Sequence, residues 1–247
     1  YSVYLGAGVY GLLLREILPP VLLFSLLWIK LGPILPNTSN LNVRYLKSFF
    51  RASGTMYLTR ASEMAYGRIG ILMIEYLLGA ATLGLVTQSM YLVNITNRST
   101  AILNQQIGLV WFSDKDRDRA ARQQGLTLLI LVTFAISLPI AICFYIYPTW
   151  IVSMLWTDTW SDAAEMLRVL SVLVVVIPLY TIGKSVMFSL RLNLQVGILY
   201  LMGLTALFVS LTSGFEIASV TLAALAMVTS YLVMLLGSAG ISWVKSR

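Results

Sequence analysis

Four charged residues interrupt an apolar stretch that is long enough to cross a membrane. Arg60, Glu63, Arg68 and Glu75 lie within residues 52–76, and about 20 residues of helix cross a hydrocarbon core of about 30 Å. At about 100° per residue, these four side chains fall within an arc of about 140° on a helix. A charge that faces lipid at mid-bilayer costs at least about 2.5 kcal/mol, so such residues turn towards a bundle interior or an aqueous cavity. The spacing therefore predicts that this helix lines a polar space.

The chemistry suited to this space is anion binding. A guanidinium group presents a rigid fork of donors that matches phosphate oxygens, so Arg60 and Arg68 are predicted substrate contacts. Glu63 follows Arg60 by three residues, and two alternatives stay open for it: a structural ion pair with Arg60, or a part in ion coupling.

Two further stretches carry polar residues that could bind substrate. Lys184 follows a proline and a glycine in a later apolar stretch, and it either contacts substrate or extends towards the membrane surface. Arg98 lies among amides in the third stretch. A cavity wall explains amides together with an arginine, whereas hydrogen bonds between helices explain the amides alone; we expect the cavity wall, with Arg98 and Asn94 as substrate contacts. The amides concerned are Gln88, Asn94, Asn97, Asn104 and Gln105.

The composition indicates an integral membrane protein. Hydrophobic residues make up 58% of the 247 residues and charged residues 11%, against about 25% charge in soluble domains. The net charge of +7 lies in spans and short connections, which argues against a nucleic-acid partner. With no histidine and one cysteine, Cys143, the chain favours neither His-based catalysis nor a metal site or cofactor, and we expect no enzyme activity.

Seven apolar stretches predict an all-α, multi-pass helical bundle, since an open chain satisfies its backbone in lipid only as helices. The predicted spans are Val3–Ile29, Ala52–Tyr76, Ala80–Val110, Gly125–Tyr147, Ala163–Leu190, Gln195–Leu211 and Ile217–Trp243. Between the first two, a linker at Gly32–Asn42 marks the domain boundary, and Val43–Phe50 is either a short amphipathic helix on the membrane surface or a solvated turn.

Basic residues predict the orientation. Four Lys or Arg residues follow the first span, four follow the third, one follows the fifth and two follow the last, whereas the opposite connections contain none. The excess of positive charge marks the cytoplasmic side, so the C-terminus is predicted to be cytoplasmic. The chain begins at Tyr1 without a signal peptide, and we expect it to be the later part of a longer protein.

Two segments resemble a known family. Residues 79–85, GAATLGL, and the segment Met154–Asn193, an outer loop with a Trp followed by a Pro-containing helix, are similar to the polysaccharide transporters. These are bacterial flippases for undecaprenyl-linked oligosaccharides, in the superfamily of the multidrug exporters and the lipid II flippase. Val86 and Thr157 depart from the residues usual in that family.

The resemblance implies a division of the chain into parts of two lobes. Residues 1–31 would be the last helix of an N-terminal lobe, 32–51 a cytoplasmic linker with the amphipathic helix, and 52–247 a six-helix C-terminal lobe. Arg15 and Glu16, close to two prolines, would mark the seam between the lobes.

The resemblance also implies a function: flipping of an undecaprenyl-diphosphate-linked oligosaccharide across the bacterial inner membrane by alternating access. Its partners would be this anionic lipid-linked glycan, the membrane and the polysaccharide polymerase or assembly proteins. Alternatives are a multidrug or small-molecule exporter of the same superfamily, a seven-span receptor, or a membrane-embedded polysaccharide polymerase or ligase. An exporter of drugs would carry more acidic interior residues, and a polymerase a larger outer loop.

Overall fold

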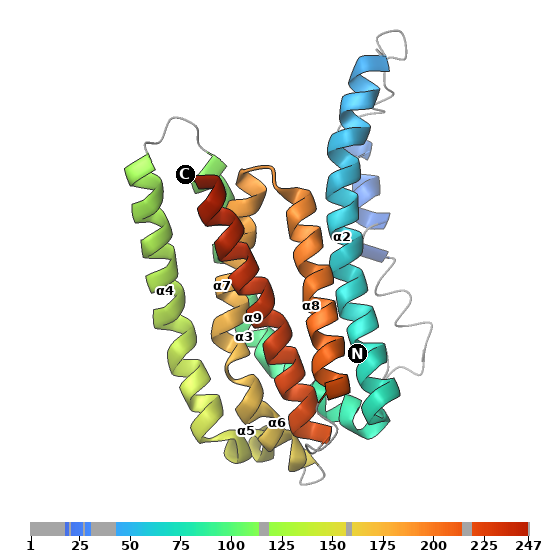
Figure 1. Cartoon of the computed structure of the whole chain (residues 1–247), viewed down its shortest axis with the longest axis vertical. Helices are drawn as coiled ribbons and strands as arrows, with labels where there is room; N and C mark the ends of the chain where they lie inside the picture. Colours follow the sequence, from blue (N-terminus) through green and yellow to red (C-terminus); the bar gives the residue numbers. More distant parts are fainter. Residues whose placement is uncertain are drawn as a thin grey trace. The chain divides into compact units, whose positions relative to one another are not determined.

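A computed structural model describes residues 18–19, 21–26, 28–30, 43–113, 119–156, 160–213 and 219–246 of the chain (Figure 1). The chain divides into two compact units, Tyr1–Phe50 and Arg51–Arg247. In the first unit the described residues are helical. The linker 32–42 and most of the first predicted span lie outside the described residues.

The second unit is a bundle of helices, and no strand occurs in the described ranges. Helix α4 and helices α7, α8 and α9 run side by side in Figure 1. The helices are α2 (Val43–Leu78), α3 (Ala80–Ser113), α4 (Arg119–Ile146), α5 (Pro148–Leu155), α6 (Asp162–Leu170), α7 (Leu173–Ser189), α8 (Asn193–Ser213) and α9 (Ser219–Ser246).

Four segments are long and apolar enough to cross a membrane, which supports the prediction of an all-α membrane protein. They are Ala120–Ile146, Asp162–Ser189, Asn193–Ser213 and Val220–Ser242. Helices α2 and α3, with 36 and 34 residues, have the length to span but are not among these four, because their polar residues lower the hydropathy. The count of seven spans therefore stays a prediction.

The boundaries differ from the predicted ones at three places. The segment Val43–Phe50 is the first part of α2 and not a separate helix, because no proline divides it from the rest. The connection between α4 and α6 contains a short helix, α5, that begins at Pro148. The fifth predicted span is interrupted at Ser171 and Val172.

At this interruption the backbone hydrogen bonds include the i→i−3 pattern of a tighter helical turn. The N–H groups of Val174 and Val175 donate to carbonyls three residues earlier, each over 3.1 Å. The Ser171 hydroxyl donates to the Arg168 carbonyl oxygen over 2.7 Å, so it competes with the helical ladder at the point where α6 ends. The interruption thus coincides with a side-chain hydrogen bond, at a place where the sequence has neither proline nor glycine.

Helix α7 lies at the centre of the bundle, where it packs against α3, α4, α8 and α9. Small residues allow two of these helices to approach closely. A Cβ placed on Gly183 of α7 would lie 2.5 Å from Ser238 Oγ of α9, and one placed on Gly108 of α3 would lie 3.2 Å from Ser185 Cβ of α7. This is the packing that membrane helices use where the hydrophobic effect does not drive them together.

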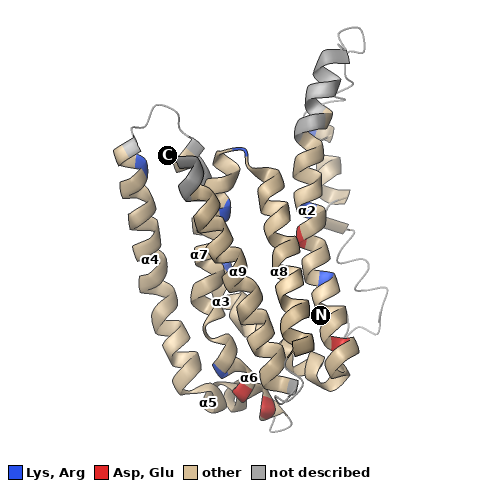
Figure 2. Ribbon diagram, viewed as in Figure 1, with Lys and Arg blue, Asp and Glu red and all other residues tan. Residues whose placement is uncertain are grey.

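Charged residues lie near both ends of the bundle, and at the α6 end one basic residue, Arg168, accompanies the acidic ones (Figure 2). Basic residues mark the start of α4 and the turn between α7 and α8, and acidic residues mark α6 at the other end. In the α7–α8 turn, Arg191 adopts a left-handed conformation with φ of 59°. A second left-handed residue, Gly79 with φ of 88°, joins α2 to α3 in a one-residue connection.

Candidate functional site

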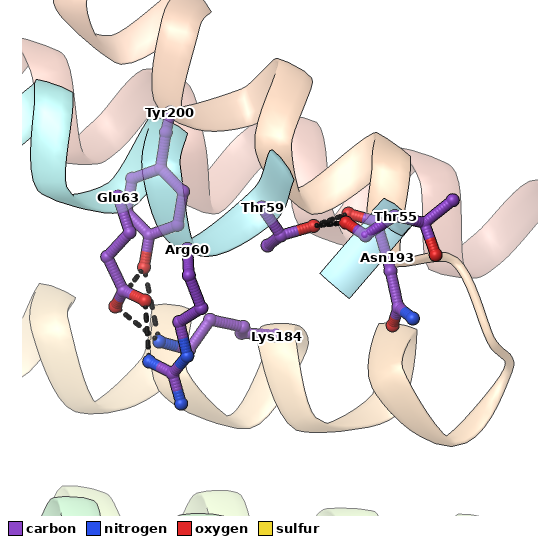
Figure 3. A network of polar contacts seen from close by, with 7 residues as sticks. All are labelled: Thr55, Thr59, Arg60, Glu63, Lys184, Asn193 and Tyr200. Atoms are coloured by element: carbon purple, nitrogen blue, oxygen red, sulfur yellow. Dashed lines mark hydrogen bonds and ion pairs between the residues drawn. The ribbon is translucent and has the colours of Figure 1, made fainter. Parts of the chain in front are cut away.

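The Glu63 carboxylate of α2 accepts hydrogen bonds from three side chains, which come from three helices (Figure 3). Its Oε1 atom accepts from Lys184 Nζ of α7 over 3.0 Å and from the Tyr200 hydroxyl of α8 over 2.8 Å. Its Oε2 atom accepts from Arg60 Nη1 over 2.8 Å. Lys184 Nζ also donates to the Tyr200 hydroxyl over 3.1 Å. We call these four residues the Glu63 network.

The members of the Glu63 network differ widely in exposure. The side chain of Lys184 is 8% exposed and that of Glu63 is 30% exposed, whereas the Arg60 side chain is 68% exposed. Lys184 thus sits inside the bundle and Arg60 on its surface, with the shared carboxylate between them. The network carries two cations and one anion, so its net charge is positive.

Tyrosines surround the buried side of the network. The Tyr200 ring lies 5.9 Å from the rings of both Tyr66 and Tyr180, and the Tyr66 ring lies 5.7 Å from that of Tyr231. The Tyr66 hydroxyl is hydrogen-bonded to Ser230 Oγ. These aromatic rings fill the space between α2, α7, α8 and α9 and fix the position of the Tyr200 hydroxyl.

Helix α2 is held against α8 close to the network. Thr59 Oγ1 donates to the carbonyl oxygen of Asn193, the first residue of α8, over 2.6 Å and also to the Thr55 carbonyl oxygen over 2.9 Å. A Cβ on Gly197 would lie 3.5 Å from Thr59 Cα, so the two backbones approach closely there. These contacts fix the position of α2 along its axis relative to α8, and so place Glu63 beside Lys184.

The inward face of α2 differs from the predicted charged arc. The buried residues are Thr59, Tyr66, Gly70 and Ile74, and of the four charged residues only Glu63 is turned towards them. Arg60, Arg68 and Glu75 are exposed. The four charges do share an arc, but the packed stripe lies at the edge of that arc and includes only its Glu63 end. A polar arc alone does not show which of its edges is packed against neighbours.

The amides of α3 separate into two groups. Asn97 and Asn104 are buried and donate to carbonyl oxygens of α7, from Asn97 Nδ2 to Leu173 over 3.4 Å and from Asn104 Nδ2 to Pro178 over 3.2 Å. Asn94 and Arg98 are exposed. The buried pair therefore bridges helices, as one of the two alternatives held, and the role of Asn94 and Arg98 as substrate contacts stays a prediction.

Lys184 takes neither of the two positions that the sequence suggested. Its ammonium group does not extend to the membrane surface and does not reach an open space, because Glu63 and Tyr200 hold it inside the bundle. Arg15 and Glu16 lie outside the described residues. Sequence reasoning missed Tyr200. The available signal was a tyrosine about two turns inside an apolar helix, deeper than the interfacial belts where tyrosines gather.

Comparison with known proteins places the chain in a family. No curated protein and no solved structure is similar enough to this chain to count as a match. A family model described as "Polysaccharide biosynthesis protein" matches residues 1–165, about two-thirds of the chain. The described part of this match contains α2 and α3, hence Arg60, Glu63, Arg68 and Arg98. The chain thus belongs to the polysaccharide biosynthesis protein family, as a membrane protein that serves the synthesis or export of polysaccharide.

Proposed function

We propose that the protein flips an undecaprenyl-diphosphate-linked oligosaccharide across the bacterial inner membrane, and that the exposed arginines of α2 and α3 bind its diphosphate. The protein acts as a transporter and not as an enzyme. It works by alternating access, in which one helical lobe rocks against another around a central site. Its C-terminus is cytoplasmic, in line with the excess of basic residues on that side.

One observation carries the proposal: Arg60, Arg68 and Arg98 project from the outside of the 51–247 bundle at the middle of long helices. Arg60 has 17 residues of α2 before it and 18 after it. An arginine at such a depth is too costly to leave in lipid, so these side chains meet a polar compartment or a polar ligand. A diphosphate fits three such groups, since each guanidinium offers paired donors to phosphate oxygens.

The position of the network suits a substrate that arrives from the cytoplasmic leaflet. Lys184 lies five residues before the end of α7, and Tyr200 seven residues after the start of α8. At about 1.5 Å per residue, Lys184 lies about 8 Å and Tyr200 about 10 Å from the α7–α8 turn. In the proposed orientation this turn is cytoplasmic, so Arg60 lies in the cytoplasmic half of the membrane, within reach of a lipid diphosphate that enters from the inner leaflet.

The family supports a role in polysaccharide synthesis, and the arginines support an anionic ligand. The sequence contains no glycine-rich phosphate loop, so we propose that an ion gradient, the membrane potential or the substrate gradient drives transport.

Arg68 provides the cleanest test, because Glu63 does not bind it. Transport of lipid-linked oligosaccharide is measured in proteoliposomes and divided by the amount of folded protein. Arg68→Ala should lower transport tenfold or more, since a charge-assisted hydrogen bond contributes about 1.5–3 kcal/mol. Arg68→Lys keeps the charge but loses the fork, so it should retain part of the activity.

Arg168 supplies a matched control. It is also an exposed arginine, but it lies on α6 at the acidic end of the bundle, so Arg168→Ala should leave transport unchanged. Normal transport by Arg68→Ala, or an equal loss with Arg168→Ala, would show that these arginines do not bind the substrate.

A further inference from the structure

Resting on the proposed function, we infer that Lys184 and Tyr200 form a fixed anchor for the Glu63 carboxylate, and that Arg60 is an exchangeable arm. In the absence of substrate Arg60 is paired with Glu63, and in its presence Arg60 moves to a phosphate oxygen of the diphosphate. Lys184 is therefore a positioning residue that acts through Glu63 and does not touch the substrate.

The two carboxylate oxygens of Glu63 have different partners. Oε1 receives both buried donors, Lys184 Nζ over 3.0 Å and the Tyr200 hydroxyl over 2.8 Å. Oε2 receives Arg60 Nη1 over 2.8 Å, from a side chain of which about two-thirds is exposed. The interaction on Oε1 is held by helices α7 and α8, whereas the interaction on Oε2 comes from the helix that carries Glu63 itself.

This division decides which contact can break. If Arg60 leaves, Glu63 still has a cation and a hydroxyl on Oε1, so its charge stays compensated. If Lys184 left, it would become an unpaired ammonium group inside the bundle, which is strongly unfavourable. The interaction of Arg60 with Glu63 is also the weaker of the two, because an exposed ion pair contributes little free energy in a solvated setting. The exchange therefore proceeds through Arg60.

A diphosphate competes well for the arm that Glu63 releases. It offers several charged oxygens, and a guanidinium binds them through two parallel hydrogen bonds, whereas Arg60 contacts Glu63 through a single nitrogen atom. The pair with Glu63 also keeps the guanidinium in one place before binding, which lowers the ordering cost when the anion arrives. The Lys184–Tyr200 anchor thus tunes how readily Arg60 accepts an anion.

The experiment measures the chemical reactivity of Arg60 in the full-length protein in liposomes of neutral phospholipid. Phenylglyoxal modifies guanidinium groups, peptide mass spectrometry reports each arginine, and inorganic pyrophosphate is the probe. In the wild-type protein, pyrophosphate should protect Arg60. In Lys184→Met the Glu63 carboxylate loses its buried cation and pairs more strongly with Arg60. Arg60 should then react more slowly with phenylglyoxal. It should also need about tenfold more pyrophosphate for half-protection, which is the effect of one charged hydrogen bond.

Two other variants extend the test. Glu63→Gln frees the arm, so Arg60 should react faster and need less pyrophosphate. Tyr200→Phe removes one donor with little change of shape and should shift Arg60 in the same direction as Lys184→Met, by less. Arg168 is the internal control in every sample, because it is exposed on α6 at the acidic end of the bundle and its reactivity should depend neither on Lys184 nor on pyrophosphate.

The outcomes separate this inference from the proposed function when transport of lipid-linked oligosaccharide is measured on the same liposomes. Equal half-protection of Arg60 in the wild type, Lys184→Met and Tyr200→Phe would overturn the anchor. Transport without any protection of Arg60 by pyrophosphate would overturn the exchange and leave the flippase in place. Protection that shifts as described, without transport, would support the exchange and overturn the flippase.

Discussion

Removing the charge of Glu63 should destabilise the protein, and removing that of Lys184 as well should restore most of the loss. In Glu63→Gln the Lys184 ammonium group stays buried without a counter-charge, while the amide oxygen of the new side chain still accepts from Tyr200. Breaking a buried pair costs about 3–5 kcal/mol. Because the Glu63 side chain is 30% exposed, we take about 2–3 kcal/mol. For a chain of this size, each kcal/mol lowers Tm by about 2–4 °C, so the expected drop is about 4–12 °C.

The assay is thermal unfolding in detergent, followed by tryptophan fluorescence, for the wild type, the two single variants and the double variant. Lys184→Met should cost less than Glu63→Gln, because Arg60 still compensates the carboxylate. The double variant, Glu63→Gln with Lys184→Met, leaves no charge unpaired inside the bundle and should unfold within about 2 °C of the wild type, which is about 0.5–1 kcal/mol.

An exposed member of the network supplies the control. Arg60→Gln removes a charge that is 68% exposed, so its cost should stay below about 1 kcal/mol. If the losses of Glu63→Gln and Lys184→Met simply add in the double variant, the two residues do not form a coupled pair. If Arg60→Gln costs as much as Glu63→Gln, the division into a buried anchor and an exposed arm is wrong.

Three further predictions concern the fold and its orientation. Gly79→Ala places a Cβ on a residue with φ of 88° where no atom lies within 4 Å, so backbone strain alone should cost about 1–2 kcal/mol in the same unfolding assay. Arg191→Gly relieves the same strain at φ of 59° and should raise stability by up to about 1 kcal/mol; a lower Tm would contradict this. In a Cys143→Ala background, single cysteines at Ser113 and Ser161 should react with an impermeant thiol reagent from opposite sides of the membrane, and reaction of both from one side would refute the topology.

The helices could be predicted from the sequence because lipid leaves the chain few other choices. Four of the predicted spans correspond to apolar helices, and their ends differ from the predicted ones by a few residues. The interruption at Ser171 could not be foreseen in the same way, since neither proline nor glycine occurs there. The interruption coincides with a hydrogen bond from one hydroxyl to a nearby carbonyl oxygen, and serines in apolar helices form this bond in many places where the helix continues.

The candidate site was predictable in its residue types but not in its pairing. A charged residue in a span signals a polar partner, and Glu63 and Lys184 do have polar partners. Their contact joins residues 121 positions apart. It depends on how α2 is rotated against α7 and α8, and that rotation is set by the buried stripe of Thr59 and Tyr66, whose neighbours are not local in sequence.

The separation of Glu63 and Lys184 has a consequence for how the protein is made. During synthesis α2 enters the membrane long before α7, so the carboxylate is already in the bilayer when the lysine leaves the ribosome. A lysine inside a span adds to the cost of insertion, by about 2.5–3.5 kcal/mol at the centre and by less near the end, where Lys184 lies. The Glu63 carboxylate, which is already in the membrane, offsets part of that cost when Lys184 inserts, whereas Tyr200 enters later with α8. The ion pair is thus available as an early assembly contact, which selects the α2–α7 neighbourhood before α8 and α9 enclose it.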